Sequence, residues 1–416
     1  RREKFWHWTR TKQIWALGIL QCEDGGYPMK YVVLGGTGEM GRFVVRDLFE
    51  TAKDAQIVVA ARDMKEVDKY AASFKSSRVT GAKVDLLEIE ATAQVLTGAT
   101  VCINCTNYYY NLHAMKACLL AKCHYVDLGG LYHMTKKQLQ FHNLFRKKDL
   151  LAIIGCGSTP GITNVMIQHA AESFEKVTSV HIRFGGHDWT KHSQHFVLPY
   201  TAYTLFDEFT DRPMILERGR IKIMEPLSGQ DNYKFPTPVG KKTCFYTLHS
   251  ELATIPQSFQ KKGLRDCSFR VCFPEDLVHD VQLLIELGMT SNKPMKIGKQ
   301  TVIPREVTAK EINRAALSSK HPKIKDMEFV WVDLEGISKR KKTKMSIYCV
   351  AKSNAKWHAS AGAVDTAVPP SIIAQMIASN QFGQRGVLPP ELCISPEPFF
   401  KELKKRGMLI KSKTKR

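Results

Sequence analysis

Residues Met29–Glu50 read MKYVVLGGTGEMGRFVVRDLFE. The apolar run Tyr31–Leu34 predicts a strand, the glycines that follow predict a turn, and the amphipathic residues after them predict a helix. The spacing Gly36-x-Gly38-x-x-Gly41 in this position is typical of a dinucleotide-binding unit. We therefore expect a nicotinamide or flavin nucleotide at this turn. The predicted contacts are Gly36, Thr37, Gly38, Glu39, Met40 and Gly41.

The end of the second predicted strand, Gln56–Ala61, bears on the choice between NAD and NADP. NAD sites place an acid near this point, whereas an arginine can pair with the 2′-phosphate of NADP. Arg62 directly follows the strand and favours NADP, while Asp63 keeps NAD open. The alternative interpretation makes Arg62 a solvated turn residue.

Short apolar strands alternate with helices up to Gly155, which predicts an α/β fold with a Rossmann-type, doubly wound parallel sheet. Its carboxyl ends lie at one edge, where ligands bind. The predicted strands are Lys30–Leu34, Gln56–Ala61, Ala82–Asp85, Thr100–Cys105, His124–Asp127 and Leu150–Ile154. The predicted helices are Glu39–Lys53, Met64–Phe74, Leu87–Leu96, Leu112–Ala121 and Thr135–Lys147.

The pattern after Gly155 is richer in strands and predicts an α+β domain with a mostly antiparallel sheet. A helix over Pro369–Ser379, with its prolines at the start, is expected near the end of the chain. We divide the chain into a disordered or artefactual leader (1–28), a Rossmann domain (29–155), an α+β substrate and dimerisation domain (156–360) and a C-terminal segment that returns to the Rossmann domain (361–416).

Composition narrows the protein class. No run of 18 apolar residues exists, so no membrane span is expected. The 11 cysteines are odd in number and mostly in apolar contexts, which favours reduced thiols and a cytoplasmic location. The pair Cys102 and Cys105 has no second pair at metal-ligand spacing, so we expect no metal.

The formal net charge of +21 raises the question of nucleic acid. The excess is concentrated in two segments, Gly336–Ser360 and Lys401–Arg416. We interpret these as a solvated loop and a frayed basic tail, and we expect no specific nucleic-acid partner. Nonspecific binding of a polyanion through the tail is the alternative, and it would show a steep dependence on salt.

Five motifs resemble the saccharopine dehydrogenase-like family, which includes saccharopine reductase, carboxynorspermidine dehydrogenase and L-lysine 6-dehydrogenase. They are LGGTGEMG (34–41), HYVDLGG (124–130), GCGSTPGITN (155–164), YTLHSELATIP (246–256) and RGVLPPE (385–391). The last two look most similar to lysine 6-dehydrogenases. The resemblance implies an NAD(P) domain, a homodimer and oxidoreduction at a C–N bond of an amino acid. Arg62 departs from an NAD-using lysine dehydrogenase and leaves the subgroup open.

Amine oxidation needs a base near the nicotinamide. Asp127 ends the fifth predicted strand, at the ligand-binding edge, and is one catalytic candidate. The resemblance places the segment with His249 and Glu251 against the cofactor cleft, so His249 is the second acid/base candidate and Glu251 a binding group. Equally open are a capping role for Asp127 and an ordinary core or loop position for His249.

Polar residues at two other strand ends are cofactor candidates. Asn104, Thr106 and Asn107 close the fourth predicted strand, near the expected nicotinamide ribose. Asp85 ends the third and would reach the adenine side or cap the next helix.

Two further functions compete with amine oxidation. Tyr132-x-x-x-Lys136 fits the Tyr/Lys pair of short-chain reductases and epimerases, but Asn111–Leu131 lacks the serine or threonine of that class and Val44 replaces its third glycine. A non-catalytic NADP-binding scaffold would bind cofactor without turnover.

Overall fold

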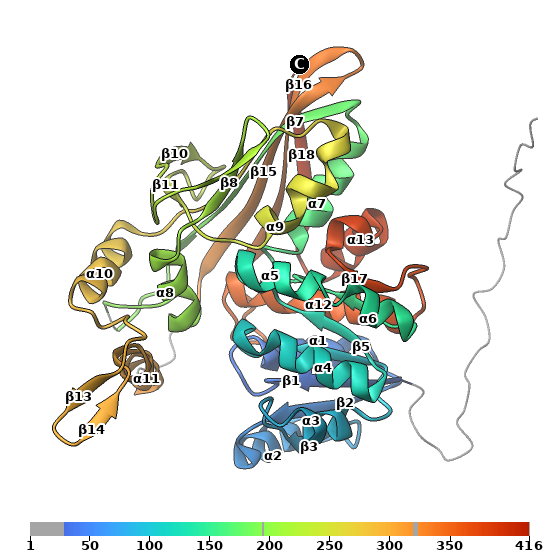
Figure 1. Cartoon of the computed structure of the whole chain (residues 1–416), viewed down its shortest axis with the longest axis vertical. Helices are drawn as coiled ribbons and strands as arrows, with labels where there is room; N and C mark the ends of the chain where they lie inside the picture. The colour runs from blue at the N-terminus through green and yellow to red at the C-terminus, as the bar shows by residue number, and fades with distance from the viewer. Residues whose placement is uncertain (1–28, 194, 319–322, 416) are drawn as a thin grey trace, which may run out of the picture.

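The computed structural model describes residues 29–193, 195–318 and 323–415, so the leader predicted over residues 1–28 lies outside the described residues. Two large sheets, each with its own helices, occupy the lower and upper parts of the molecule in Figure 1. The lower sheet contains the glycine turn, and we call it the Rossmann sheet. The upper one we call the second sheet.

The Rossmann sheet has seven strands in the order β17-β6-β5-β4-β1-β2-β3, and all of its described neighbours run parallel. The order reverses between β1 and β4, which is the point where doubly wound sheets bind ligands. The predicted parallel sheet is therefore confirmed. Its strands are β1 (Met29–Leu34), β2 (Ala55–Ala61), β3 (Val79–Lys83), β4 (Val101–Asn104), β5 (His124–Asp127), β6 (Leu151–Ile153) and β17 (Gly386–Leu388).

Helices cover both faces of this sheet because its strands are apolar on both sides. On β1, Tyr31 and Val33 pack in a cluster with residues of α1 and α2, while Val32 and Leu34 pack with residues of α3, α4 and α6. The elements that follow these strands are α1 (Gly41–Thr51), α2 (Met64–Ala72), α3 (Ile89–Leu96), η1 (Tyr108–Tyr110), α4 (Asn111–Ala121), α5 (Leu131–Leu139) and α6 (His142–Lys147).

The second sheet follows the order β10-β11-β12-β7-β15-β16-β18, with β8 beside β12 and β9 beside β8. Only the β12–β7 pair among the described neighbours is parallel, so the predicted, mostly antiparallel sheet is confirmed. Its strands are β7 (Lys176–Asp188), β8 (Met214–Glu217), β9 (Arg220–Ile223), β10 (Asp231–Lys234), β11 (Lys241–Tyr246), β12 (Asp266–Val271), β15 (Asp326–Ser338), β16 (Lys341–Lys352) and β18 (Leu409–Lys415).

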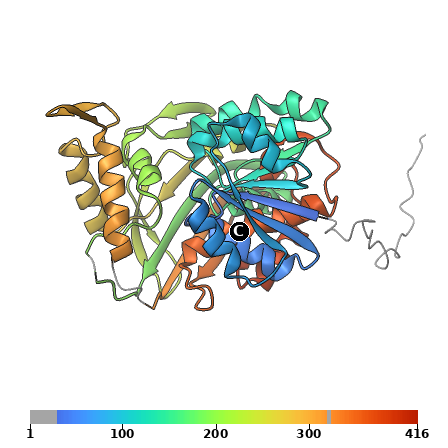
Figure 2. The same ribbon diagram turned by 90° about the horizontal axis from the view of Figure 1, so that it is seen from below.

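The remaining helices pack around this sheet and between the two sheets. α10, α11 and the hairpin β13–β14 project to one side of the molecule, at the left of Figures 1 and 2. Within the described parts, no helix is both long and apolar enough to cross a membrane. These elements are α7 (Ile162–Glu172), α8 (Ala202–Thr210), α9 (Glu251–Ser258), η2 (Gln260–Lys262), α10 (Glu275–Glu286), β13 (Met295–Ile297), β14 (Gln300–Val302), α11 (Pro304–Ser318), α12 (Ala361–Ala378), η3 (Pro390–Leu392) and α13 (Pro396–Lys405).

The last part of the chain is shared between the two sheets. α12 packs on α1, and β17 pairs with β6 at the edge of the Rossmann sheet. β18 instead pairs with β16 of the second sheet, from Lys344↔Lys415 to Val350↔Leu409. The expectation of a frayed basic tail is wrong for Leu409–Lys415, because the backbone of these residues extends the sheet.

Three predicted element boundaries are wrong. The predicted helix over Pro369–Ser379 begins eight residues earlier, at Ala361, because the hydroxyl of Ser360 caps its first turn. The single helix predicted over Thr135–Lys147 is two helices, α5 and α6. The third strand runs over Val79–Lys83, because those residues align with Ile57–Ala61 of β2.

The expectation of reduced thiols is wrong for Cys244 and Cys272, which form a disulfide. Cys244 lies on β11 and Cys272 directly follows the neighbouring strand β12, which brings together two cysteines that are 28 positions apart in sequence. The other described cysteines are free thiols.

A buried ion pair fastens the C-terminal segment to α1. Asp47 accepts a hydrogen bond from Arg406 at 2.7 Å and another from the hydroxyl of Ser371 at 2.7 Å, and only 1% of Asp47 is exposed. Removing one member of a buried pair leaves the other charge without compensation.

We therefore expect Asp47→Ala to lower the free energy of unfolding by about 3 kcal/mol. Denaturant unfolding followed by circular dichroism measures the change. The matched control is Asp54→Ala on the exposed loop before β2, with an expected effect below about 0.5 kcal/mol. Equal effects of the two substitutions would contradict the anchoring role of Asp47.

Candidate active site

The glycine turn packs so closely that side chains are excluded from it. A Cβ on Gly41 would lie 2.1 Å from the carbonyl oxygen of Gly35, and a Cβ on Gly36 would lie 2.9 Å from Cγ1 of Val59. Gly38, in contrast, is exposed at the tip of the turn. The backbone of the turn is therefore open to a ligand on its outer side.

The turn is fixed from one side by Arg42, whose guanidinium donates to the carbonyl oxygens of Thr37 and Gly38 at 2.9 and 3.2 Å. No side chain caps the first turn of α1. Its N–H groups and the positive end of the helix dipole are thus free for an anion, and a dinucleotide pyrophosphate fits this arrangement. Glu39 is exposed and Met40 half-buried on the same turn.

At the end of β2, the side chain of Asp63 is hydrogen-bonded within the described part of the protein and that of Arg62 is not. The carboxylate of Asp63 caps α2, accepting from the N–H groups of Lys65 and Glu66 at 3.0 and 3.3 Å. Arg62 is exposed and has no hydrogen bond or ion pair with any described residue. Its guanidinium is free to bind a phosphate, while the adjacent acid, Asp63, is occupied by the helix.

Asp85 lies in the turn after β3 rather than at a strand end. Its carboxylate accepts from the N–H of Leu87 at 3.0 Å, and its carbonyl oxygen accepts from the hydroxyl of Thr92. These contacts organise the turn that leads into α3. The side chain is exposed, so the contacts do not remove it from reach of a ligand.

The polar residues at the end of β4 form an internal network. Asn104 is 1% exposed and donates to Asn111 at 2.9 Å and to the hydroxyl of Tyr125 at 3.3 Å. The side-chain oxygen Oδ1 of Asn104 accepts from the hydroxyl of Thr106 at 2.7 Å. The side chain of Asn107 caps η1. Asn104 thus positions Thr106, which lies against the glycine turn where a Cβ on Gly35 would be 3.0 Å from its methyl group.

Asp127 is enclosed at the end of β5, with 0% of its surface exposed. One oxygen accepts from the N–H groups of Gly129 and Gly155 at 3.0 and 2.7 Å. The other accepts from Tyr125 and Gln138 at 3.0 and 2.5 Å. Burial raises the pKa of Asp127, and these hydrogen bonds oppose that shift. The carboxylate holds the ends of β5 and β6 together and has no free lone pair for a substrate proton.

His249 and Glu251 form a buried pair at the start of α9. His249 is 7% exposed, and its Nδ1 is hydrogen-bonded to the carboxylate of Glu251. The other oxygen of Glu251 accepts from Thr163 at 2.9 Å, and the imidazole stacks on Phe269 at a ring distance of 3.7 Å. Burial disfavours the charged imidazole, but the carboxylates of Glu251 and Glu208 outweigh it and raise the pKa of His249.

The second nitrogen of this imidazole is unoccupied. Nε2 of His249 has no hydrogen-bond partner among the described residues, because the only polar contact of the ring is made through Nδ1. A carboxylate on Nδ1 and a free Nε2 are the features that let a histidine pass a proton to and from a substrate.

Glu208 on α8 was not found from the sequence. It is 3% exposed and bonded to the hydroxyl of Tyr200. Burial raises the pKa of Glu208 to about 7, even though the nearby imidazole of His249 acts in the opposite direction. The available signal was its position in AYTLFDEFT (202–210), where adjacent acids interrupt an otherwise apolar helix.

A second cluster, whose members Asp207 and Arg305 were not found from the sequence, connects the two sheets. Asp207 accepts from the hydroxyls of Tyr108 and Tyr109 on η1, at 2.6 and 2.5 Å. Its other oxygen accepts from Arg305 of α11 at 2.6 Å, and that arginine is 3% exposed. The cluster ties the residues after β4 to α8, and so fixes α8, which carries Glu208, against the Rossmann sheet.

The loop between β6 and α7 joins the site to the C-terminal segment. Asn164 accepts from the N–H of Gly161 at 3.0 Å and donates to Glu391 at 2.7 Å. Glu391 also accepts from Ser258 on α9 at 2.8 Å, and it is 3% exposed. Three motifs that are distant in sequence, around residues 155–164, 246–256 and 385–391, therefore meet in one buried network.

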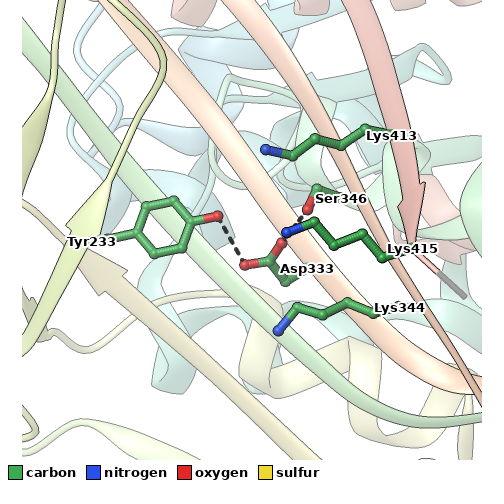
Figure 3. Close-up of a pocket in the computed structure, with 6 residues that line it drawn as sticks. All are labelled: Tyr233, Asp333, Lys344, Ser346, Lys413 and Lys415. Carbon is green, nitrogen blue, oxygen red and sulfur yellow. Dashed lines mark hydrogen bonds between the residues drawn. The ribbon is translucent and has the colours of Figure 1, made fainter.

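A separate basic hollow of about 120 Å³ lies on the second sheet. Figure 3 shows the side chains of Lys344, Lys413 and Lys415 extending into it beside Asp333. Asp333 is already neutralised by Arg183 at 2.9 Å. The hollow includes no residue of the glycine turn or of the His249 pair. Among the residues that the structure describes, no group of three or more His, Cys, Asp or Glu side chains is placed to hold a metal ion.

Comparison with known proteins covers nearly the whole chain. The sequence pattern described as "Saccharopine dehydrogenase NADP binding domain" matches residues 31–160, and that of the "Saccharopine dehydrogenase C-terminal domain" matches residues 157–408. Carboxyaminopropylagmatine dehydrogenase from Synechocystis sp. is 22% identical over 399 residues, which are 91% of this chain and 96% of that protein.

Two solved structures share the fold. The saccharopine dehydrogenase (L-Glu forming) of Saccharomyces cerevisiae has a TM-score of 0.70 at 15% identity, covering 93% of this chain and 100% of that one. The homospermidine synthase of Legionella pneumophila, solved in complex with NAD, has a TM-score of 0.61 at 13% identity, covering 94% and 91%.

Proposed function

Because the chain belongs to the saccharopine dehydrogenase family and is an NAD(P)-dependent oxidoreductase, we propose that it oxidises or forms the C–N bond of a secondary amine that carries an amino-acid head group. The observation that carries this proposal is the buried pair of His249 and Glu251 with a free Nε2. Amine oxidation needs such a base, because the nitrogen must lose its proton before the carbon can give up hydride.

In the proposed reaction, His249 transfers protons and Glu251 stabilises its charged form. The bound nicotinamide would accept the hydride from the carbon of the C–N bond. Nε2 of His249 takes the proton that the substrate nitrogen releases, and Glu251 stabilises the imidazolium through Nδ1. After this proton has passed to solvent, the neutral imidazole removes a proton from the water that adds to the C=N bond. The imidazolium then gives that proton to the nitrogen of the adduct, so that the C–N bond breaks and a carbonyl compound and an amine leave.

The cofactor would be held by the glycine turn and the open N-terminus of α1, with Arg62 on the 2′-phosphate of NADP. Thr106, Asn107 and the exposed Asp85 remain our proposed contacts to the ribose and adenine parts of the cofactor. We now propose that Asp127 and Asn104 are positioning residues, since all their hydrogen-bonding groups are used within the protein.

The relative from Synechocystis supports a substrate of the N-(carboxyalkyl)amine type, because its name states dehydrogenation of carboxyaminopropylagmatine. We prefer this type of substrate to lysine, which is supported only by the resemblance of the motifs at residues 246–256 and 385–391 to lysine 6-dehydrogenases. We also propose a cytoplasmic homodimer, supported by the family resemblance and testable by light scattering after size-exclusion chromatography.

The experiment is a panel of amines assayed by the absorbance of NAD(P)H in both directions. Carboxyaminopropylagmatine, saccharopine and lysine are each supplied with NAD and with NADP, and the carbonyl and amine products are supplied with NADH and NADPH. We expect turnover of an N-(carboxyalkyl)amine. Cofactor binding without turnover of any of the three would favour a non-catalytic NADP-binding protein instead.

Substitution of Arg62 by serine tests the cofactor preference. We expect the dissociation constant of NADPH to rise about 10- to 100-fold, because a charge-assisted hydrogen bond to the phosphate is lost, while NADH binding stays the same. Fluorescence titration measures both, and Lys69→Ser on the exposed face of α2 is the control. An equal loss for both cofactors, or no loss, would exclude a role for Arg62 in reading the 2′-phosphate.

A further inference from the structure

Two carboxyl groups lie within electrostatic reach of each other where α12 packs on the second sheet, and neither has a cation beside it among the described residues. Asp365 is the only charged residue of α12 and is 0% exposed. Glu328 of β15 lies against the start of the same helix, since a Cβ on Gly362 would be 2.9 Å from its Oε2. Across the described residues, neither carboxylate has a lysine, arginine or histidine nitrogen within 4.0 Å.

Three buried oxygen atoms at this place have no hydrogen-bond partner in the part of the chain that the structure describes. They are Oδ2 of Asp365, Oε2 of Glu328 and the hydroxyl oxygen of Ser158. Ser158 is itself 4% exposed, and it lies close enough to Asp365 to lower the pKa of that carboxyl without making a well-oriented hydrogen bond. Burial is the larger influence and raises the pKa of both acids.

Such an arrangement is costly in a free protein. An unpartnered buried polar group costs roughly 1–3 kcal/mol, and two neighbouring carboxyls without a cation add repulsion or must hold a proton. Native proteins satisfy nearly all buried polar groups, so three orphan oxygens in one place point to a missing hydrogen-bond donor.

The position connects these atoms to the proposed active site. Ser158 belongs to the loop after β6, whose Gly155 is bonded to Asp127 at the ligand-binding edge of the Rossmann sheet. On the other side, Tyr200 is bonded to Glu208 and lies within electrostatic reach of Glu328. Tyr200 thus lies between Glu328 and Glu208, the acid that is itself within electrostatic reach of His249.

We propose that Asp365, Glu328 and Ser158 form a subsite for a cationic end of the substrate, a guanidinium or a primary ammonium, away from the reacting C–N bond. This inference rests on the proposed function, because the subsite is placed relative to His249. A guanidinium supplies five N–H donors and a delocalised positive charge, which matches two carboxylates and a hydroxyl acceptor. An ammonium supplies three donors and fits the same atoms.

Binding of two matched probes tests the subsite without any turnover. The probes are butylguanidine and its neutral isostere butylurea, titrated calorimetrically into the protein saturated with NADP. We expect the guanidine to bind about 10- to 100-fold more tightly, since charged hydrogen bonds are lost in the urea. Asp365→Asn and Glu328→Gln should each remove most of this preference. The controls are Asp54→Asn and Glu397→Gln, which change exposed acids.

Equal affinity for the two probes would overturn the subsite, as would the absence of binding up to about 10 mM. A preference that survives in Asp365→Asn and Glu328→Gln, as it does in the controls, would overturn it as well. Both variants keep the size of the side chain and should therefore fold. Their melting temperatures, compared with that of the wild type, check this. If the preference is found but no amine of the panel is turned over, the subsite stands and the proposed reaction fails.

Discussion

Substitution of His249 by asparagine should lower kcat/KM for amine oxidation by about 100-fold or more, the scale of a lost general base. Asparagine can keep the hydrogen bond to Glu251 because its side-chain N–H₂ occupies the place of Nδ1. It has no counterpart of Nε2, the atom that we assign to proton transfer. The expected loss is in kcat, whereas the affinity for NADP stays the same.

The pH profile separates this role from a structural one. Glu251 and Glu208 raise the pKa of His249 above 6.5 in spite of its burial, so the rate of amine oxidation should fall as the pH drops below this raised pKa. Glu251→Gln removes the nearest carboxylate and should move the fall in rate to lower pH. The reverse reaction needs the protonated imidazole, so the rate of amine formation should fall as the pH rises above the same pKa.

The matched control is His279→Asn, because the side chain of His279 is 82% exposed on α10. Steady-state kinetics, NADP titration and melting curves are compared for the three proteins. Turnover by His249→Asn within about threefold of the wild type would contradict general-base catalysis by His249.

Substitution of Gly41 by alanine should weaken NADP binding by about 100-fold or leave the Rossmann part unfolded, because displacing the turn costs about 2–3 kcal/mol. The new Cβ would lie 2.1 Å from the carbonyl oxygen of Gly35 and 2.9 Å from Cα of Gly36. Both are backbone atoms, so the contact cannot be relieved by a change of rotamer. The turn would have to move away from the phosphate position.

Gly383→Ala is the control, since nothing lies within 4 Å of the position of its Cβ. Fluorescence titration with NADPH gives the affinity, and circular dichroism gives the folded fraction. Wild-type affinity in a folded Gly41→Ala protein would contradict the close packing of the turn as the basis of cofactor binding.

The first half of the fold could be predicted because its signals are local. The stretch from Tyr31 to Gly41 contains the strand, the turn and the start of the helix, and the hydrophobic pattern of each later strand is equally short-range. The edge strand β17 and the pairing of β18 with β16 depend on residues far apart in sequence. The lysine-rich segment Leu409–Lys415 has no apolar face, so its sequence did not predict a strand.

The candidate site was predicted less completely, because residue type does not reveal environment. Asp127 has the right position for a base, but four donors that converge on its carboxylate could not be seen in the sequence. His249 and Glu251 are two positions apart, and their pairing was therefore within reach. Glu208 and Asp365 act through neighbours on other elements, and their only sequence signal is a charge inside an apolar helix.

Transfer of deuterium tests hydride exchange at the amine carbon most directly. An N-(carboxyalkyl)amine with deuterium on the carbon of its C–N bond is incubated with NADP and the protein, and the nicotinamide is analysed by mass spectrometry. We predict that NADPH gains one deuterium and that His249→Asn suppresses the transfer. Deuterium that stays on the amine, or that appears in water while NADPH remains unlabelled, would contradict the proposed reaction.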